Sequence, residues 1–163
     1  MEPFDLLGPL PTGTTVLEAS AGTGKTYALA GLVTRYVAAG AARLDEMLLI
    51  TFGRAASQEL RERVRSQLLE AERALADPDR WRDDPDLLGH LVDGSAADVA
   101  VRHSRLRDAL ANFDAATIAT THQFCQLVLR SLGVAGDDSV SSATGSQPST
   151  GSSDKSLPGP AKT

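Results

Sequence analysis

A glycine-rich octet at residues 19–26 constrains the fold of this chain more than any other feature of its sequence. It reads Ala-Ser-Ala-Gly-Thr-Gly-Lys-Thr, which matches the pattern of a phosphate-binding loop except that alanine replaces the first glycine. Such a loop joins a strand to the N-terminus of a helix. The apolar run 15–18 before the octet and the helical spacing of apolar residues after it fit this context. We therefore expect an α/β fold, with a strand at 15–18 in a parallel sheet flanked by helices.

The residue types in the octet suit phosphate binding. Gly22 and Gly24 let the backbone curl so that its N–H groups point at phosphate oxygens, next to the positive end of the helix dipole. Lys25 is expected to reach the β- and γ-phosphates of a nucleotide, and the Thr26 hydroxyl to bind Mg²⁺, which makes these two the candidate catalytic residues. The alternative is a surface loop that happens to contain a lysine. The candidate nucleotide-binding residues are Ala19, Ser20, Ala21, Gly22, Thr23, Gly24, Lys25 and Thr26.

Composition indicates one domain in a reducing environment. The chain has 163 residues and only 4% aromatic residues, so Ala, Leu and Val must fill its core. Its net charge of −5 excludes a broadly basic nucleic-acid-binding surface and leaves room only for local contacts. The single cysteine, Cys125, is expected to be a small core residue in a cytoplasmic protein. The acidic N-terminus is not typical of a signal peptide, and no membrane-spanning run is present in the sequence.

Apolar periodicity and stop signals divide the rest of the chain into helices, strands and a tail. Helices are expected from the octet to Gly40, at 55–76, at 87–92, after Ser95 and at 122–132. Strands are expected at 47–52 and 116–120, and the continuous apolar character of 47–52 predicts burial on both faces. Residues 139–163 are rich in Ser, Gly and Pro and have too few apolar residues for a core, so we expect a disordered tail.

Three blocks in this order resemble superfamily 1 helicases of the UvrD/Rep type. They are 17–26, which contains the octet, 50–64 and 118–125. The run Glu-Ala-Ser-Ala-Gly-Thr-Gly-Lys-Thr and the His-x-Phe-Cys ending of the third block narrow the resemblance to the RecB family, the beta subunits of exonuclease V. The resemblance implies that 1–138 is the N-terminal part of a RecA-like P-loop NTPase domain with the start of an insertion, and that 139–163 lies outside it.

The resemblance also implies ligands, partners and further site residues. ATP and Mg²⁺ would be the cofactors, and DNA with RecC- and RecD-like subunits would be the partners, in double-strand-break repair and recombination. Gly53 departs from the family, where threonine is usual, which removes one hydroxyl from the expected DNA track. The residues expected to contact single-stranded DNA are Thr51, Phe52, Thr120, Thr121 and His122.

Several of these residues have structural alternatives. Phe52 follows an apolar strand and could be a core residue. His122 at a helix start could be a solvated or capping side chain. Neither His90 nor His103 is assigned a role, and the arginines at 61, 63 and 65 alternate with glutamates as on a solvated helix face.

Parts needed for catalysis in this family are missing from the sequence. No apolar strand ends in Asp-Glu, and the chain has neither a second RecA-like domain with its arginine finger nor a nuclease domain. We expect a truncated helicase subunit that is inactive alone. One alternative is a non-catalytic module that binds a nucleotide or a partner and competes with the full subunit. Another is a small P-loop kinase, which the interleaving of arginine with glutamate on helices disfavours.

Overall fold

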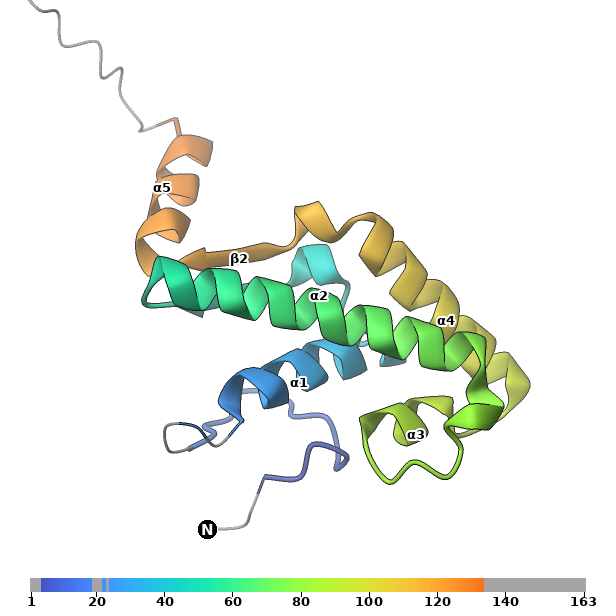
Figure 1. Cartoon of the computed structure of the whole chain (residues 1–163). Helices are drawn as coiled ribbons and strands as arrows, with labels where there is room; N and C mark the ends of the chain where they lie inside the picture. Colours follow the sequence, from blue (N-terminus) through green and yellow to red (C-terminus); the bar gives the residue numbers. More distant parts are fainter. Residues whose placement is uncertain (1–3, 19–21, 23, 134–163) are drawn as a thin grey trace, which may run out of the picture.

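The computed structural model describes residues 4–18, 22 and 24–133 of the chain (Figure 1). The predicted disordered tail at 139–163, and Ala19, Ser20, Ala21 and Thr23 of the octet, lie outside the described residues. The helices are α1 (Lys25–Ala39), α2 (Arg54–Ala76), α3 (Leu87–Val92), α4 (Ala96–Ala111) and α5 (Thr121–Ser131). The strands are β1 (Leu48–Thr51) and β2 (Thr117–Thr120), and short 3₁₀ turns are η1 (Leu44–Glu46), η2 (Pro78–Arg80) and η3 (Phe113–Ala115).

The helix boundaries follow local signals, and the helices predicted from the sequence are confirmed. Gly40 ends α1 in the left-handed conformation, with φ of 70°, and its N–H donates to the carbonyl oxygens of Tyr36 and Val37. Ser95 caps α4, where its hydroxyl accepts from the N–H of Asp98 at 3.2 Å and the Asp98 carboxylate accepts from the N–H of Ser95. These signals lie within a few residues of each boundary, which explains why the sequence alone placed them.

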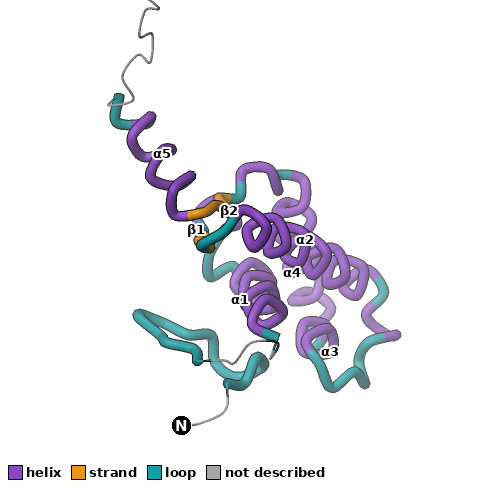
Figure 2. The backbone as a smooth tube through the Cα atoms, turned by 60° about the vertical axis from the view of Figure 1, so that its left-hand side comes forward, coloured by secondary structure: helices purple, strands orange, loops and turns teal. Residues whose placement is uncertain are grey.

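The core lies around α2, which packs against α1 and α4 (Figures 1 and 2). Its largest fully buried side chains are small or medium-sized, as the composition predicted: Leu68, Leu87, Leu106, Val64, Val92 and Thr34. Burying each such leucine side chain contributes about 1.5–3 kcal/mol to folding. The helical part of the molecule therefore holds most of its apolar burial.

The two strands form a parallel pair in which Leu48 lies opposite Thr117 and Thr51 opposite Thr120. The helix α2 contacts both strands, and the half-buried Leu49 packs against the core. The prediction that 47–52 is buried on both faces is wrong, since Leu48 and Ile50 are 46% and 44% exposed. These two side chains lie on the opposite face from Leu49, because side chains alternate along a strand. In the described part of the chain, nothing buries that face.

The predicted strand at 15–18 is not formed in the structure. Val16 is 80% exposed and Leu17 41% exposed, and no strand is assigned among residues 4–18. The chain that precedes it contacts α1, where the Tyr36 hydroxyl donates to the carbonyl of Pro11 and the Arg35 guanidinium to that of Leu6 (Figure 1). A strand requires backbone partners on a neighbouring strand, and this segment has none within the described residues.

The last helix, α5, extends away from the sheet and has no buried residue (Figure 1). The prediction that Cys125 is a core residue is therefore wrong, because its side chain is exposed. The exposed apolar residues of this region are Leu127, Val128, Leu129 and Leu132. None of the described helices has the length and apolar character that crossing a bilayer requires.

Candidate functional site

Two glycines in the described part of the octet have the backbone conformation that the sequence analysis expected of them. Gly22 and Gly24 have φ of 77° and 84°, a region that side chains with a Cβ rarely adopt. A Cβ at either position would meet no heavy atom within 4 Å, so the dihedral angle and not crowding requires glycine. The predictions for Ala19, Ser20, Ala21 and Thr23 fall on residues outside the described part.

The helix α1 begins at Lys25, directly after this turn, so the predicted junction of loop and helix is present. Gly24 is its N-cap, no side chain of the described residues caps it, and no acidic residue lies in its first turn. The first N–H groups of a helix have no carbonyl partners within the helix, and they carry its positive dipole end. Lys25 is exposed and Thr26 half-buried beside these groups. The N–H groups and Lys25 suit an anion such as phosphate, and the Thr26 hydroxyl suits a cation bound beside it.

The second group of candidate residues gathers at the carboxyl ends of β1 and β2. Thr51 and Thr120 are register partners there, which brings together residues that are far apart in the sequence. The Thr51 hydroxyl donates to the carbonyl of Gly53 at 3.2 Å and is hydrogen-bonded to the Ser57 hydroxyl. Its hydroxyl thus helps to shape the turn into α2. In open α/β sheets this edge is where ligands bind.

Thr120 is the N-cap of α5, not an open contact residue. Its hydroxyl accepts from the N–H of Gln123 at 3.2 Å, and its own N–H donates to the Gln123 side-chain oxygen at 2.9 Å. Thr120 is also only 6% exposed. The capping interpretation that the sequence left open for His122 is therefore wrong, since Thr120 caps the helix.

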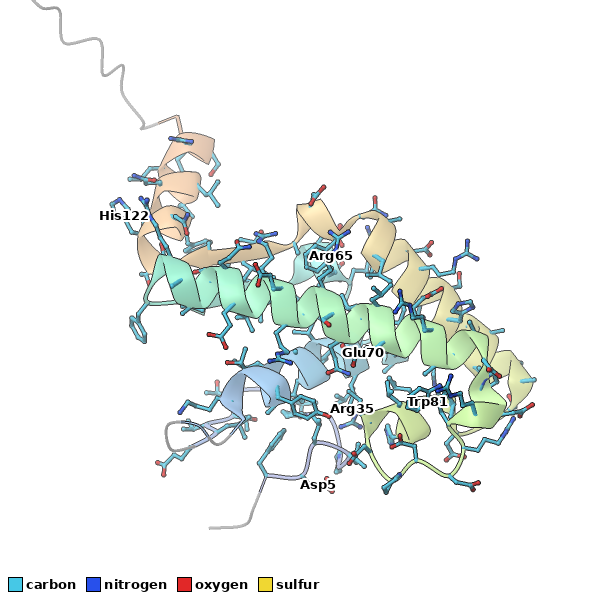
Figure 3. All side chains as sticks on the ribbon, viewed as in Figure 1. Asp5, Arg35, Arg65, Glu70, Trp81 and His122 are labelled. Atoms are coloured by element: carbon cyan, nitrogen blue, oxygen red, sulfur yellow. The ribbon has the colours of Figure 1, made fainter. Side chains whose placement is uncertain are left out.

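Three side chains at this edge are open to solvent. Phe52 is fully exposed, so its interpretation as a core residue is wrong. Thr121 and His122 are also exposed, and the His122 Nε2 lies 3.0 Å from the amide nitrogen of Gln126 (Figure 3). An aromatic face, a hydroxyl and an imidazole at one edge match the side chains that stack on bases and contact backbone phosphates in single-stranded nucleic acid.

A hollow of about 400 Å³ lies between α1, α3 and α4, and the sequence analysis did not predict it. Arg35, Arg102 and Arg105 line it with His90. Partial desolvation lowers the pKa of His90, although the residue is exposed, and the nearby charges of Arg35 and Arg102 lower it further. Arg102 and Arg105 lie three residues apart on one helix, and this spacing was the only local pattern in the sequence that could have indicated the hollow. Their proximity to Arg35 depends on tertiary packing.

The structure thus shows a helix that begins directly after two glycines of positive φ, and a polar edge on a parallel strand pair. The comparisons establish the family. The chain belongs to the UvrD/REP helicase N-terminal domain family, whose model matches residues 7–149.

Three relatives that bear the name RecBCD enzyme subunit RecB are similar to this chain. The chain is 70% identical over 139 residues to the RecBCD enzyme subunit RecB of Mycolicibacterium smegmatis, a match covering 84% of this chain and 12% of the relative. It is 67% identical over 145 residues to the RecBCD enzyme subunit RecB of Mycobacterium tuberculosis, covering 86% and 13%. It is 36% identical over 125 residues to that of Escherichia coli, covering 72% and 10%. The chain thus spans about an eighth of the length of the mycobacterial relatives.

Proposed function

We propose that this chain is the ATP-binding N-terminal portion of an ATP-dependent DNA helicase/exonuclease subunit of the RecB kind. The observation that carries the proposal is the start of α1 at Lys25 after two glycines of positive φ, in a chain of this helicase family. Double-strand-break repair and recombination is the proposed process, because RecB is the name its relatives bear. A cytoplasmic location is part of the same proposal.

The proposed nucleotide site comprises the octet Ala19, Ser20, Ala21, Gly22, Thr23, Gly24, Lys25 and Thr26. The N–H groups at the start of α1 would hold phosphate oxygens, and the Lys25 ammonium would neutralise charge on the outer phosphates. The Thr26 hydroxyl would hold Mg²⁺, which supplies charge neutralisation at the transferring phosphoryl group when bound. Lys25 and Thr26 are thus the proposed catalytic residues. The carboxylates and the arginine finger that complete such a site in this family are not among the residues of this sequence.

The proposed DNA contacts lie at the strand edge. Phe52, Thr121 and His122 are the exposed residues there and would stack on bases or bind backbone phosphates. Thr51 and Thr120 would act by holding the turn and the helix cap in place, because their hydroxyls already have protein partners. RecC- and RecD-like subunits are the proposed protein partners, since the relatives are subunits of an enzyme named RecBCD.

A thermal melt of the purified chain with and without Mg-ATP tests the nucleotide site. A ligand that binds only the native state stabilises it by about 2.7 kcal/mol at a hundredfold excess over Kd, which raises Tm by several degrees. We expect this rise in the parent chain and its loss in Lys25→Ala. Lys155→Ala is the matched control, since it removes the same charge outside the octet and should retain the rise. An equal rise in Lys25→Ala would refute the assignment of the loop.

The exposed apolar residues favour a second candidate function, a non-catalytic module that docks on a partner. Leu48 and Ile50 on β1, Leu127 on α5 and Leu132 at its C-cap are 44–68% exposed, which is unusual for so many large apolar side chains. Such a module would compete with the full subunit for its partners. Adding the chain in excess to a reconstituted RecBCD enzyme tests this, because competition requires a loss of unwinding activity. Unchanged unwinding would exclude it.

A further inference from the structure

Three arginines and a histidine converge on the hollow between α1, α3 and α4, far from the octet. Arg35 comes from the second half of α1, His90 from α3, and Arg102 and Arg105 from α4. Figure 3 shows Arg35 between α1 and the N-terminal segment that carries Asp5. Arg35 is ten residues after Lys25 on the same helix, which places the two Cα atoms about 15 Å apart. The hollow is thus a separate feature from the nucleotide loop.

Backbone carbonyl groups fix the guanidinium groups in place. Arg105 donates to the carbonyl oxygen of Ala38 at 2.9 Å, and Arg102 donates to that of Leu91 at 2.8 Å and to that of Asp93. Arg35 donates to the carbonyl of Leu6, and its other terminal nitrogen lies 3.4 Å from the His90 Nε2. Each guanidinium has five N–H donors, so each retains donors beyond those used here.

The carbonyl oxygens orient the arginines but carry no formal negative charge of their own. Within the described residues, none of the three lies within 4.0 Å of a carboxylate oxygen. Asp98 also lines the hollow, where its carboxylate accepts from the Ser95 hydroxyl at 2.7 Å and from the Ser95 N–H at 3.2 Å. The charge of Arg102 helps to lower the pKa of Asp98, so Asp98 offsets part of the charge of Arg102 from beyond ion-pair distance. Arg35 is only 8% exposed, and a buried cation without a close counter-ion is costly. The site therefore favours an added anion.

We propose that this hollow binds a phosphoryl group through Arg35, Arg102 and Arg105. A guanidinium donates two parallel N–H groups to two phosphate oxygens, and three such groups match a dianion better than a single carboxylate. Two sources share this chemistry, namely free inorganic phosphate and a backbone phosphate of single-stranded DNA. The inference does not depend on ATP binding at the octet.

His90 provides a local reporter of occupancy. Its pKa is lowered by partial desolvation and by the charges of Arg35 and Arg102, while Asp93 and Asp5 act in the opposite direction. An anion held among the arginines would offset their charge, and an opposite charge at about 4–6 Å shifts a pKa by roughly one unit or more. A bound phosphoryl group must therefore raise the His90 pKa. Chloride at equal ionic strength, which only screens charge, should raise it far less.

The test is an NMR titration of the imidazole signals of the full chain in phosphate and in chloride at matched ionic strength. The Lys25→Ala background removes phosphate binding at the octet, and His90→Gln assigns the signal among the three histidines. We expect phosphate to raise the His90 pKa by about one unit relative to chloride. Arg105→Gln should abolish most of this rise. Arg107→Gln is the matched control on the same helix, since Arg107 is exposed and does not line the hollow.

Further arms identify the source and define the result that overturns the proposal. Micromolar single-stranded oligothymidylate is compared with inorganic phosphate at the same phosphate concentration. A larger rise of the His90 pKa with the oligonucleotide identifies the DNA backbone as the ligand, and a larger rise with inorganic phosphate identifies free phosphate. The proposal is overturned if the His90 pKa is equal in phosphate and in chloride. It is also overturned if Arg105→Gln and Arg107→Gln reduce the phosphate-induced rise equally, or if polyglutamate raises the pKa and phosphate does not. Thermal melts of both arginine variants establish that they are folded.

Discussion

The helical core and the strand edge of this molecule are built in opposite ways. The helix α2 buries eight of its residues between α1, α4 and the strands, whereas α5 buries none. The β1 strand shows the same contrast within four residues, because Leu49 packs on the core while Leu48 and Ile50 face solvent. The comparison teaches that stability resides in the helices, and that the exposed DNA-contact candidates lie on the side that contributes least to it.

The largest expected effect comes from removing a core side chain of α2. Leu68→Ala deletes a leucine with no exposed area and should lower the free energy of unfolding by about 2–5 kcal/mol, which denaturant titration measures. Leu127→Ala on α5, where the side chain is 50% exposed, is the matched control and should change it by less than about 0.5 kcal/mol. Similar losses in the two variants would break the comparison.

A second prediction separates binding from stability at the strand edge. Phe52→Ala should weaken binding of single-stranded DNA by about 1–3 kcal/mol, as expected for the loss of one base-stacking aromatic, and leave Tm unchanged. Fluorescence anisotropy with a labelled oligonucleotide measures this effect. Phe4→Ala is the control, since Phe4 is also exposed but belongs to the N-terminal segment. Equal affinity of the parent and the Phe52 variant would remove Phe52 from the DNA site.

A third prediction compares two glycines that flank helices. Gly40→Ala places a Cβ 2.5 Å from the Arg105 guanidinium carbon at φ of 70°, and should cost about 1–2 kcal/mol. Gly53→Ala has φ of −130° with no heavy atom within 4 Å of the added Cβ, so its stability should be unchanged or slightly higher. Urea unfolding distinguishes them. A stable Gly40 variant would mean that the cap of α1 contributes little.

The smallest expected effect is a pH dependence that originates in the helical part. Because the His90 pKa is lowered in the folded state, the unfolded state binds the proton more readily, and folding stability is lost as pH falls below about 6.5. His90→Gln should flatten this loss between about pH 6.5 and 5 without changing stability at pH 8. Thermal melts across this range in chloride measure the slope. An identical slope in parent and variant would assign the dependence to other groups.

The sequence was sufficient where structure depends on neighbours along the chain. Gly40 and Ser95 identified helix ends, and the apolar spacing identified α2 and α3 to within a residue or two. It was insufficient where a partner had to be present. Val16 and Leu17 have strand composition, but a strand forms only beside another strand. The apolar run at 47–52 predicted a strand correctly, but its composition alone does not determine whether one face or both faces will be buried.

The candidate site divides in the same way. The junction at Lys25 and the edge position of Phe52 followed from pattern and family resemblance. The assignment of Thr120 as a helix cap needed the geometry of Gln123, and the hollow needed α1, α3 and α4 to be packed together. Residues 35, 90 and 105 are too far apart in sequence for any local pattern to group them.

The parallel pairing of β1 and β2 also has a consequence for the folding order. The register partners Leu48 and Thr117 are 69 residues apart in the sequence, whereas the contacts between α2 and α3 close over far shorter loops. Loop-closure entropy rises with this separation, so we expect the contacts between α2 and α3 to form before the strands pair. The contacts of α1 with α4 close over a similar length of chain, since Arg105 donates to the carbonyl of Ala38. We expect amide hydrogen exchange at the strands to be faster than in the middle of α2.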